Sequence, residues 1–528
     1  MTNQKIAINM KIVRNGTKKG RELLKGGNIY VRSKKVEPSS ENQELKRGIK
    51  GWQVSFIGLG GVIGSCYFLG VGTCLGEMGP AVLIAFAIVG VIVYGLMIAY
   101  AELLVNLPRK GSFVAYTNEF LGETLSTGMG WSFWFNWVCY VPSEAVAVAT
   151  VLQYLTGSTS GVFYVACAVG ALLALTIINL CAVDIFAKIE SGLAITKVCV
   201  IILFIILAFG IWVGLWGSDH FLGGSVNFGG DEGFVPQMFP KGMAIVFTSM
   251  TVVLVTFQGT EIVGLAAAEA QDPEKSVPRA CKSVTYRIAG LYMVPILLIV
   301  LIYPWNLGTE DNPIFADIMN RYNMGFFGII MSAVVLIAAF SCANTGFYGT
   351  VRAMFGLSIE GLAPKFLSKL TKTSNPRNAA LFTLLFMWIV LIIGLVSELT
   401  GAMSSLYANL LSLSGFTGTL AWVGICASQL VFRKRLKKRG YDPETCLKAR
   451  VKKGQTWLPA FAMIAQIIFL IMMAFGEGQF PAFCLATASV IVPMIIRVIA
   501  RKTGHVRNVN ALSHDEKSFD ETFPDLNK

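Results

Sequence analysis

The sequence predicts an all-α polytopic membrane protein, and three observations support that fold class. The 528 residues are 54% hydrophobic and 14% charged, and their mean hydropathy is +0.62. Apolar runs long enough to cross a lipid bilayer as helices recur along the chain. Basic residues gather beside such runs, as they do at the cytoplasmic face of membrane proteins. The location of these charges makes nucleic acid an unexpected partner, in spite of the net charge of +13.

Hydropathy predicts twelve transmembrane helices, at residues 52–74, 80–105, 129–156, 162–183, 190–216, 242–267, 286–306, 325–356, 379–398, 404–431, 457–476 and 481–499. We divide the chain accordingly into a basic tail (1–50), a helical core (51–431), a basic loop (432–456), a final helix pair (457–499) and a second tail (500–528). The core has two halves, at about 51–217 and 242–431.

Two basic clusters predict the topology. The first fifty residues hold thirteen Lys/Arg against four Glu, and residues 433–453 hold ten Lys/Arg. Both clusters adjoin predicted spans, so we expect both termini in the cytoplasm and the chain in a plasma membrane of the bacterial inner-membrane type. Specific contact of these clusters with anionic lipid is the less favoured interpretation.

The first span contains glycines where a helix interior usually excludes them. Residues 58–64 include Gly58, Gly60, Gly61 and Gly64, and glycine disfavours helix. A helix that breaks inside the membrane exposes backbone groups that hydrocarbon cannot satisfy. Its freed N–H groups suit an anion and its freed carbonyls suit a cation, so one zwitterion could use both. Alternatively, the glycines only let helices pack closely.

The sixth span repeats this feature. Residues 257–264 place two glycines, a threonine and Glu261 inside an apolar stretch. Spans one and six are five apart and enter the membrane from opposite sides. Interrupted helices at matching positions of two inverted five-helix halves are typical of a secondary transporter whose site lies between the halves. The last two spans fall outside this repeat.

Several ionisable side chains lie in or beside the predicted spans, where a charge costs roughly 2.5–3.5 kcal/mol and usually has a partner. Glu261 either has a functional role or caps the break in its own helix. Glu269, near the cytoplasmic boundary, is either functional or a solvated helix-end charge. Glu144, in the third span, either pairs with a substrate amine or holds a buried donor.

Lys197 lies in an apolar run of the fifth span. A buried ammonium there could replace a bound cation and release its proton, because burial disfavours the charged form. The alternative is a side chain that extends toward the nearby cytoplasmic end. In the eighth span, Asn344 belongs to a small and polar segment (341–346) that either lines a cavity or packs against span one.

Cysteine and histidine predict neither a disulfide framework nor a metal site. The eleven cysteines are scattered singly without a CxxC pair, and the three histidines fall outside the predicted spans. Scattered cysteines of this kind are typical of small buried hydrophobic residues. We expect no cofactor and no enzymatic activity, because no metal-ligand pair or nucleophile–base pair is present in the spans.

These motifs resemble the amino acid permeases of the amino acid–polyamine–organocation superfamily, nearest the amino acid transporter branch. The resemblance covers about residues 45–440, and its sixth-span and loop motif is long and specific. The matching segments are residues 60–65, 257–261, 266–270, 272–280, 344–348, 360–364 and 413–418. One departure is Cys66-Tyr67, which replaces the usual small residue and aliphatic residue and is expected to reshape the floor of the pocket.

The resemblance implies ten helices in two inverted repeats plus two more, and proton-coupled import of an amino acid. Carried over by position, the N–H groups of Gly64, Ser65 and Cys66 would hold the substrate carboxylate. Carbonyls near Val62, Val255, Thr256 and Gln258 would take the α-amino group, Phe257 would be an aromatic lid, and Lys197 would replace the coupling cation.

The resulting prediction is a proton symporter that imports an amino acid through the lipid bilayer. A cationic amino acid is slightly favoured, because lysine-transporting members of the family carry carboxylates at the positions of Glu261 and Glu269. The alternatives are an exchanger or uniporter, and a non-transporting amino acid sensor that uses the same pocket.

Overall fold

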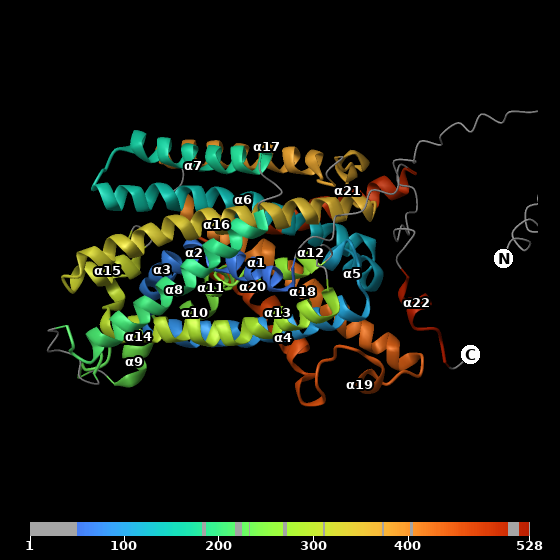
Figure 1. Cartoon of the computed structure of the whole chain (residues 1–528), viewed down its shortest axis with the longest axis horizontal. Helices are drawn as coiled ribbons and strands as arrows, with labels where there is room; N and C mark the ends of the chain where they lie inside the picture. The colour runs from blue at the N-terminus through green and yellow to red at the C-terminus, as the bar shows by residue number, and fades with distance from the viewer. Residues whose placement is uncertain are drawn as a thin grey trace, which may run out of the picture. The chain divides into compact units, whose positions relative to one another are not determined.

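The computed structural model describes residues 50–181, 186–216, 224–231, 233–267, 272–309, 312–371, 374–401, 405–504 and 517–526. Within these residues the secondary structure is helical apart from one isolated bridge between Ser225 and Phe228. Long helices lie side by side and surround shorter, interrupted ones (Figure 1). The all-α prediction is therefore confirmed for the part of the chain that the structure describes.

Nine segments of the described residues are helical, long and apolar enough to cross a membrane. Their main helices are α4 (Val82–Asn106), α6 (Glu123–Thr156), α7 (Gly161–Cys181), α8 (Phe186–Trp212), α16 (Gly325–Ile359), α17 (Arg377–Leu399), α18 (Leu406–Lys438), α20 (Leu458–Met472) and α21 (Phe480–Lys502). This matches a multi-pass membrane protein. The count of twelve crossings and the inverted repeat remain predictions.

Three of the expected spans are divided into shorter helices. The first comprises α1 (Gly51–Val62), α2 (Ser65–Phe68) and α3 (Gly70–Met78), and the sixth comprises α10 (Ala244–Thr248), α11 (Met250–Val255) and α12 (Ile262–Ala267). The seventh, expected to be continuous, joins α13 (Pro273–Ile288) to α14 (Val294–Ile302) through a π-helical turn, η4 (Ala289–Met293).

The first break lies at the C-terminal end of the glycine cluster. Helix α1 continues through Val62, and only Ile63 and Gly64 leave the helical conformation. The earlier glycines instead permit close packing, because a Cβ on Gly58 would collide with the Val263 side chain of α12. Both interpretations of the cluster therefore hold, each for different glycines.

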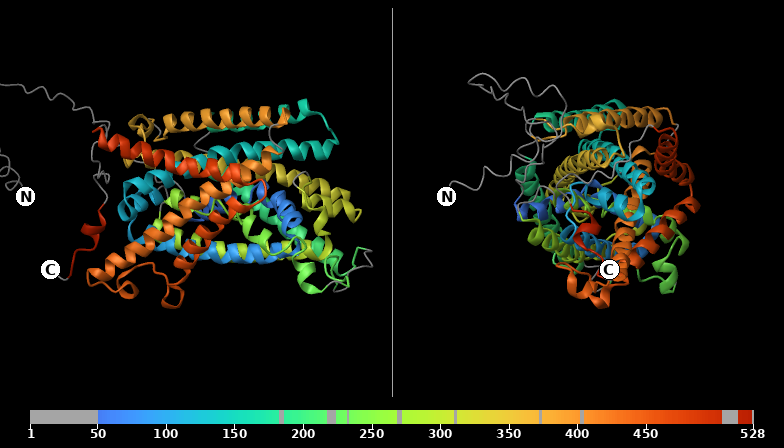
Figure 2. Two further views of the ribbon diagram at one scale, coloured as in Figure 1. Left: turned by 180° about the vertical axis from the view of Figure 1, so that it is seen from behind. Right: turned by 90° about the vertical axis from the view of Figure 1, so that its right-hand side faces the viewer.

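Helices α6, α16 and α18 form the wall against which the interrupted helices pack. Helix α6 contacts both α16 and α18, and α16 also contacts α1, α2 and α12. Helices α8 and α4 also contact the interrupted helices, and Figure 2 shows the long helices lying around the shorter ones. This arrangement places both breaks in the interior of the helical body, away from the surface.

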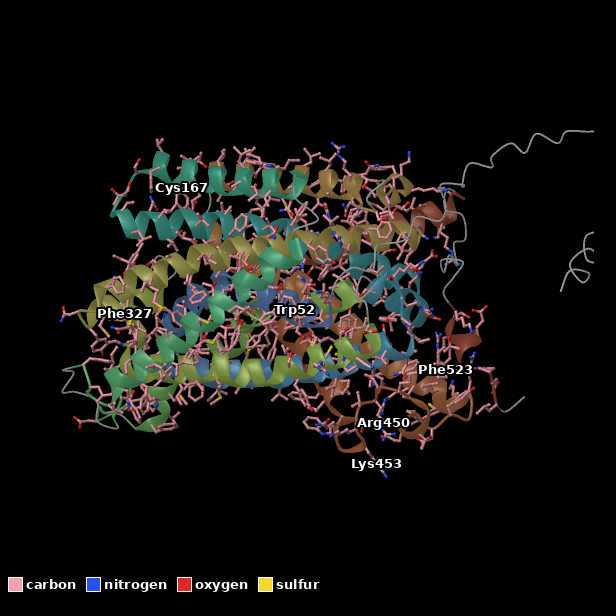
Figure 3. The ribbon with its side chains drawn as sticks, in the orientation of Figure 1. Trp52, Cys167, Phe327, Arg450, Lys453 and Phe523 are labelled. Atoms are coloured by element: carbon pink, nitrogen blue, oxygen red, sulfur yellow. The ribbon has the colours of Figure 1, made fainter. Side chains whose placement is uncertain are left out.

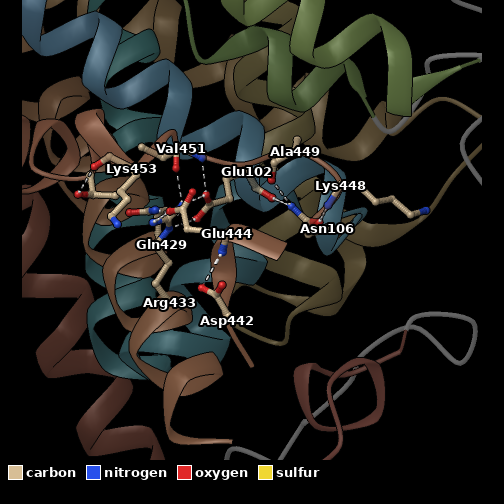
Figure 4. Close-up of polar contacts among 11 residues, drawn as sticks. Glu102, Asn106, Gln429, Arg433, Asp442, Glu444, Lys448, Ala449, Val451 and Lys453 are labelled. Atoms are coloured by element: carbon tan, nitrogen blue, oxygen red, sulfur yellow. Dashed lines mark hydrogen bonds and ion pairs between the residues drawn. The ribbon is translucent and has the colours of Figure 1, made fainter. Parts of the chain in front are cut away.

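The basic loop is fixed to the helices by one buried carboxylate. Glu102, fully buried near the end of α4, pairs with Arg433 of α18 at 2.7 Å and accepts a hydrogen bond from the Val451 amide at 2.7 Å (Figure 4). A buried charge needs such partners to offset its desolvation. Arg450 and Lys453 of the same loop are exposed at the edge of the molecule (Figure 3).

A segment that follows the last long helix also returns to this end of the structure. Helix α22 (Phe519–Thr522) packs the buried Phe519 ring against both Phe120 and Phe432, each 5.8 Å away between ring centroids. The Phe519 amide donates to Glu119 Oε1 at 2.6 Å. Residues 517–526 thereby join helix α5 (Ser112–Leu121) to the end of α18.

Candidate functional site

The two broken helices touch each other backbone to backbone. A Cβ on Gly259, in the second break, would collide with the Gly61 carbonyl oxygen at the end of α1. Gly259 also has a φ of +102°, which side chains rarely adopt. Glycine is therefore required at this position on both grounds, and it brings the freed backbone groups of the two helices into one interior site.

The start of α2 holds an anion, and that anion belongs to the protein itself. Glu144 of α6 accepts hydrogen bonds from the Ser65 amide at 3.0 Å to Oε2 and 3.2 Å to Oε1. Gly64 leaves room for this carboxylate, since a Cβ there would collide with Glu144 Oε1 and lie 2.7 Å from Cys342 Sγ. The position expected for a substrate carboxylate is thus occupied by the side chain of Glu144.

The end of α1 holds a cation. Lys197 of α8 is fully buried, and its ammonium donates to the carbonyl oxygens of Gly60 and Ile63, both at 2.8 Å. These carbonyls lie in the last turn of α1 and in the break, where the helical hydrogen-bonding pattern ends. A single side chain thus supplies donors that hydrocarbon could not provide.

Tyr292, which the sequence analysis did not identify, contacts both breaks. Its hydroxyl is positioned to donate to the Val62 carbonyl at 3.2 Å and to the Thr256 carbonyl at 3.0 Å. Tyr292 lies in the π-helical turn η4, three residues before Pro295. Proline lacks an N–H and disrupts the preceding helical turn, so Pro295 was the available sequence signal for an irregularity here.

Tyr67, the unusual residue in the first-span motif, fixes this turn. Its hydroxyl donates to the Leu291 carbonyl at 2.6 Å, the carbonyl that the absent N–H of Pro295 leaves without its helical donor. Its ring lies 4.4 Å from that of Tyr292. The neighbouring Cys66 thiol is 2.8 Å from the Tyr140 hydroxyl. Cys66-Tyr67 therefore fills the floor of the site with buried side chains.

The second break is held mainly by its own side chain. Glu261 Oε2 accepts from the Gly259 amide at 3.0 Å and from the Trp422 indole at 2.9 Å. Gln258 donates from its side chain to the Ser414 carbonyl of α18 at 3.0 Å. Phe257 is buried and stacks on Tyr292, with 4.7 Å between ring centroids.

The remaining predicted residues lie near the site or outside the described chain. The Val255 carbonyl accepts from Cys66 Sγ at 3.9 Å, on the second-break side of the pocket. Asn344 accepts a hydrogen bond from Asn179 of α7 at 2.9 Å. Glu269 falls outside the described residues, so the structure tests neither interpretation of this residue.

Glu190 is a second residue that the sequence analysis missed. It lies on α8 seven residues before Lys197, hence on the same helical face. It is fully buried, and its Oε1 accepts a hydrogen bond from Ser341 of α16. Its Oε2 has no hydrogen-bond partner among the described residues. Hydropathy treated Glu190 as the boundary of the fifth span, although this seven-residue spacing could have identified it.

Together these contacts enclose a small polar site inside an apolar helical body. A carboxylate satisfies the freed amide, an ammonium satisfies two freed carbonyls, and a hydroxyl bridges carbonyls of both breaks. A zwitterion presents the same two kinds of group, an anion and a hydrogen-bond-donating cation.

Comparisons with known proteins find relatives over most of the chain. A family model described as amino acid permease matches residues 53–512. The chain is 34% identical to the amino-acid permease RocC of Bacillus subtilis, over 76% of this chain and 83% of that protein. It is 32% identical to the lysine-specific permease LysP of Lactococcus lactis, over 86% and 88%. It is 31% identical to the gamma-aminobutyric acid permease of Escherichia coli, over 84% and 91%.

Proposed function

This chain belongs to the amino acid permease family, and we propose that it imports an amino acid together with a proton. The observation that supports the proposal is the pair of buried charges at the first break. Lys197 holds the carbonyls of Gly60 and Ile63, while Glu144 holds the Ser65 amide. A candidate proton carrier and an anion position therefore share one short stretch of backbone.

The substrate carboxylate competes with Glu144 for the Ser65 amide. Ser65 has one amide N–H, and Glu144 already accepts from it with both carboxylate oxygens. A carboxylate that loses its donors inside the membrane is costly to keep charged. Substrate entry therefore leaves Glu144 as the neutral acid, and one proton enters the site with each substrate.

Lys197 performs the proton-release step of the transport cycle. Its ammonium stabilises the end of α1 only while the carbonyls of Gly60 and Ile63 face it at 2.8 Å. When the broken helix moves toward the inward-open state, these donors lose their acceptors, and the buried ammonium releases its proton to the cytoplasmic side. The proton that Glu144 gained passes to the neutral Lys197 amine as the site resets, so both residues regain their charges and one proton has moved inward with each substrate. The inward proton gradient then drives substrate accumulation.

A cationic amino acid is the slightly favoured substrate. The names of two relatives, from Lactococcus lactis and Escherichia coli, describe lysine-specific permeases, with 32% and 30% identity to this chain. Glu261 offers a buried Oε1 without a hydrogen-bond partner among the described residues. A cationic side chain that reaches Glu261 would pair with this oxygen.

Uptake into proteoliposomes tests the proposal. The purified protein is given radiolabelled lysine, arginine, alanine, leucine or glutamate, with and without an inward proton gradient. We expect accumulation only with the gradient, and competition by lysine and arginine first. Exchange without a gradient would indicate an antiporter, and gradient-independent equilibration a uniporter. Binding without any flux would indicate a sensor. Inhibition by leucine or alanine alone would exclude the cationic preference.

A further inference from the structure

The Tyr292 hydroxyl can donate a hydrogen bond to a backbone carbonyl of each broken helix. We propose that this hydroxyl is a placeholder for the substrate α-ammonium and thereby a determinant of specificity for amino acids over acids without that amine. This inference rests on the proposed function, because it takes the carbonyls of Val62 and Thr256 as the amine site. It adds a residue of the seventh span to that site.

The hydrogen-bonding geometry supports a placeholder. Tyr292 Oη lies 3.2 Å from the Val62 carbonyl and 3.0 Å from the Thr256 carbonyl. A hydroxyl carries one proton, so it can fully satisfy only one of these acceptors at a time, whereas an ammonium carries three N–H donors. An incoming ammonium therefore satisfies both carbonyls better than the hydroxyl that it displaces.

The surroundings of the ring permit this exchange. The Tyr292 ring stacks on Phe257 at 4.7 Å and packs against Tyr67 at 4.4 Å. The hydroxyl moves only together with its ring, and these aromatic neighbours keep the ring in apolar contact when it shifts away from the carbonyls. The backbone beneath it is a π-helical turn, a local irregularity that occurs frequently at functional sites. Tyr67 supplies a donor to the Leu291 carbonyl of that turn.

The same site holds a second placeholder on its anionic side. Glu144 accepts a hydrogen bond from the Ser65 amide, just as Tyr292 donates to the two carbonyls. A carboxylate and a hydroxyl of the protein thus satisfy these backbone groups. A ligand with an ammonium and a carboxylate on one carbon replaces both groups. An acid without the amine replaces only Glu144 and leaves Tyr292 in position.

Tyr292→Phe tests the placeholder, because it removes the hydroxyl and keeps the ring. The probes are lysine, leucine and glutamate, each compared with its analogue lacking the α-amino group: 6-aminohexanoate, 4-methylpentanoate and glutarate. Kd values are measured by calorimetry on the purified full-length protein. We expect the Kd of the bound amino acid to fall about tenfold in the variant, because the bare carbonyls no longer have a competing donor. The Kd of its analogue should stay unchanged.

Tyr322→Phe is the matched control, since Tyr322 likewise donates to a backbone carbonyl, that of Ile302, away from both breaks. Its Kd values should equal those of the wild type. A purely structural role of Tyr292 would shift the Kd values of amino acid and analogue together. An unchanged or raised amino acid Kd in Tyr292→Phe would overturn the inference. A wild-type protein that binds none of the three amino acids would instead contradict the proposed function.

A second measurement keeps the inference testable if Tyr292→Phe does not fold. The wild-type chain is prepared with 3-fluorotyrosine at position 292 alone and followed by ¹⁹F NMR. Displacement of the hydroxyl predicts that the bound amino acid shifts the resonance and that its analogue without the α-amino group does not. Equal shifts with both ligands, or no shift with the amino acid at saturation, would contradict it.

Discussion

Both breaks leave backbone N–H and C=O groups without helical partners, but different kinds of side chain satisfy these groups in each break. In the first, the freed groups of Gly60, Ile63 and Ser65 are satisfied by charged side chains from α8 and α6. In the second, Gly259 is satisfied by Glu261, two residues away in the same break. Both solutions place an ionisable residue in the interior of the helical body.

The difference lies in what can happen when helices move. A break held by side chains of other helices loses its partners when those helices separate, so its charges can change state during a transport cycle. A break capped by its own carboxylate moves with that carboxylate. The first break therefore depends on charged contacts with α6 and α8, whereas the second combines its own carboxylate with contacts to α18.

The largest expected effect comes from filling the first break. Gly64→Leu should abolish substrate binding, because its side chain would occupy the space of Glu144 and Cys342. The φ of Gly64 is −111°, which any residue can adopt, so the loss of binding would come from steric conflict and not from backbone strain. Calorimetry on the purified variant measures the loss. Gly170→Leu, whose Cβ would meet open space on α7, is the control. Wild-type affinity in Gly64→Leu would exclude this segment as the carboxylate site.

Lys197→Met should abolish accumulation driven by a proton gradient while leaving exchange of bound substrate. About 100 mV supplies about 2.3 kcal/mol per proton, which corresponds to roughly fifty-fold accumulation of a neutral zwitterion. Steady-state accumulation in proteoliposomes should fall from that range to equilibration. Lys241→Met, at an exposed lysine, should behave as the wild type. Full accumulation by Lys197→Met would mean that the proton takes another route, with Glu261 the next candidate.

Glu144→Gln should have an intermediate effect. The neutral amide no longer gains or loses a proton when substrate enters, so the pH dependence of substrate Kd should flatten. The Kd itself should change by less than tenfold, since one charged hydrogen bond contributes about 1.5–3 kcal/mol and glutamine replaces part of it. Calorimetry between pH 5 and 8 measures both, with the exposed Glu477→Gln as control. An unchanged pH profile would remove Glu144 from the coupling scheme.

Glu261→Gln should have the smallest effect, because one side-chain oxygen remains to accept from the Gly259 amide and the Trp422 indole. The accumulation ratio at saturating substrate should stay within about twofold of the wild type, although the Kd of a cationic substrate should rise because glutamine has no charge to pair with its side chain. Glu261→Ala should instead lower thermal stability by leaving two buried donors unsatisfied, at about 1–3 kcal/mol each. Uptake and melting temperature are the measurements. Loss of accumulation in Glu261→Gln comparable to that in Lys197→Met would break the contrast between the two sites.

Much of the fold follows from hydropathy, because membrane helices are long apolar runs. Lys197 and Glu144 were predictable as site candidates, since a charge inside such a run is conspicuous. Tyr292 was not, because a tyrosine in an aromatic-rich helix carries no such contrast, and only Pro295 marks the irregular turn around it. The first break, at Ile63 and Gly64, falls within the predicted glycine cluster, but the sequence did not show that the helix continues as far as Val62. Packing against Val263 keeps Gly58 helical, and sequence alone does not contain that contact.

The docking of residues 517–526 imposes an order on biogenesis. The Phe519 amide and Glu119 are 400 residues apart in the chain, yet they form one hydrogen bond. Helix α5 is synthesised early, and its partner emerges only after every long helix has been translated. Until then the rings of Phe120 and Phe432 lack the Phe519 ring that packs against both. A nascent chain halted before residue 517 therefore exposes an aromatic surface that quality-control proteases and chaperones could recognise.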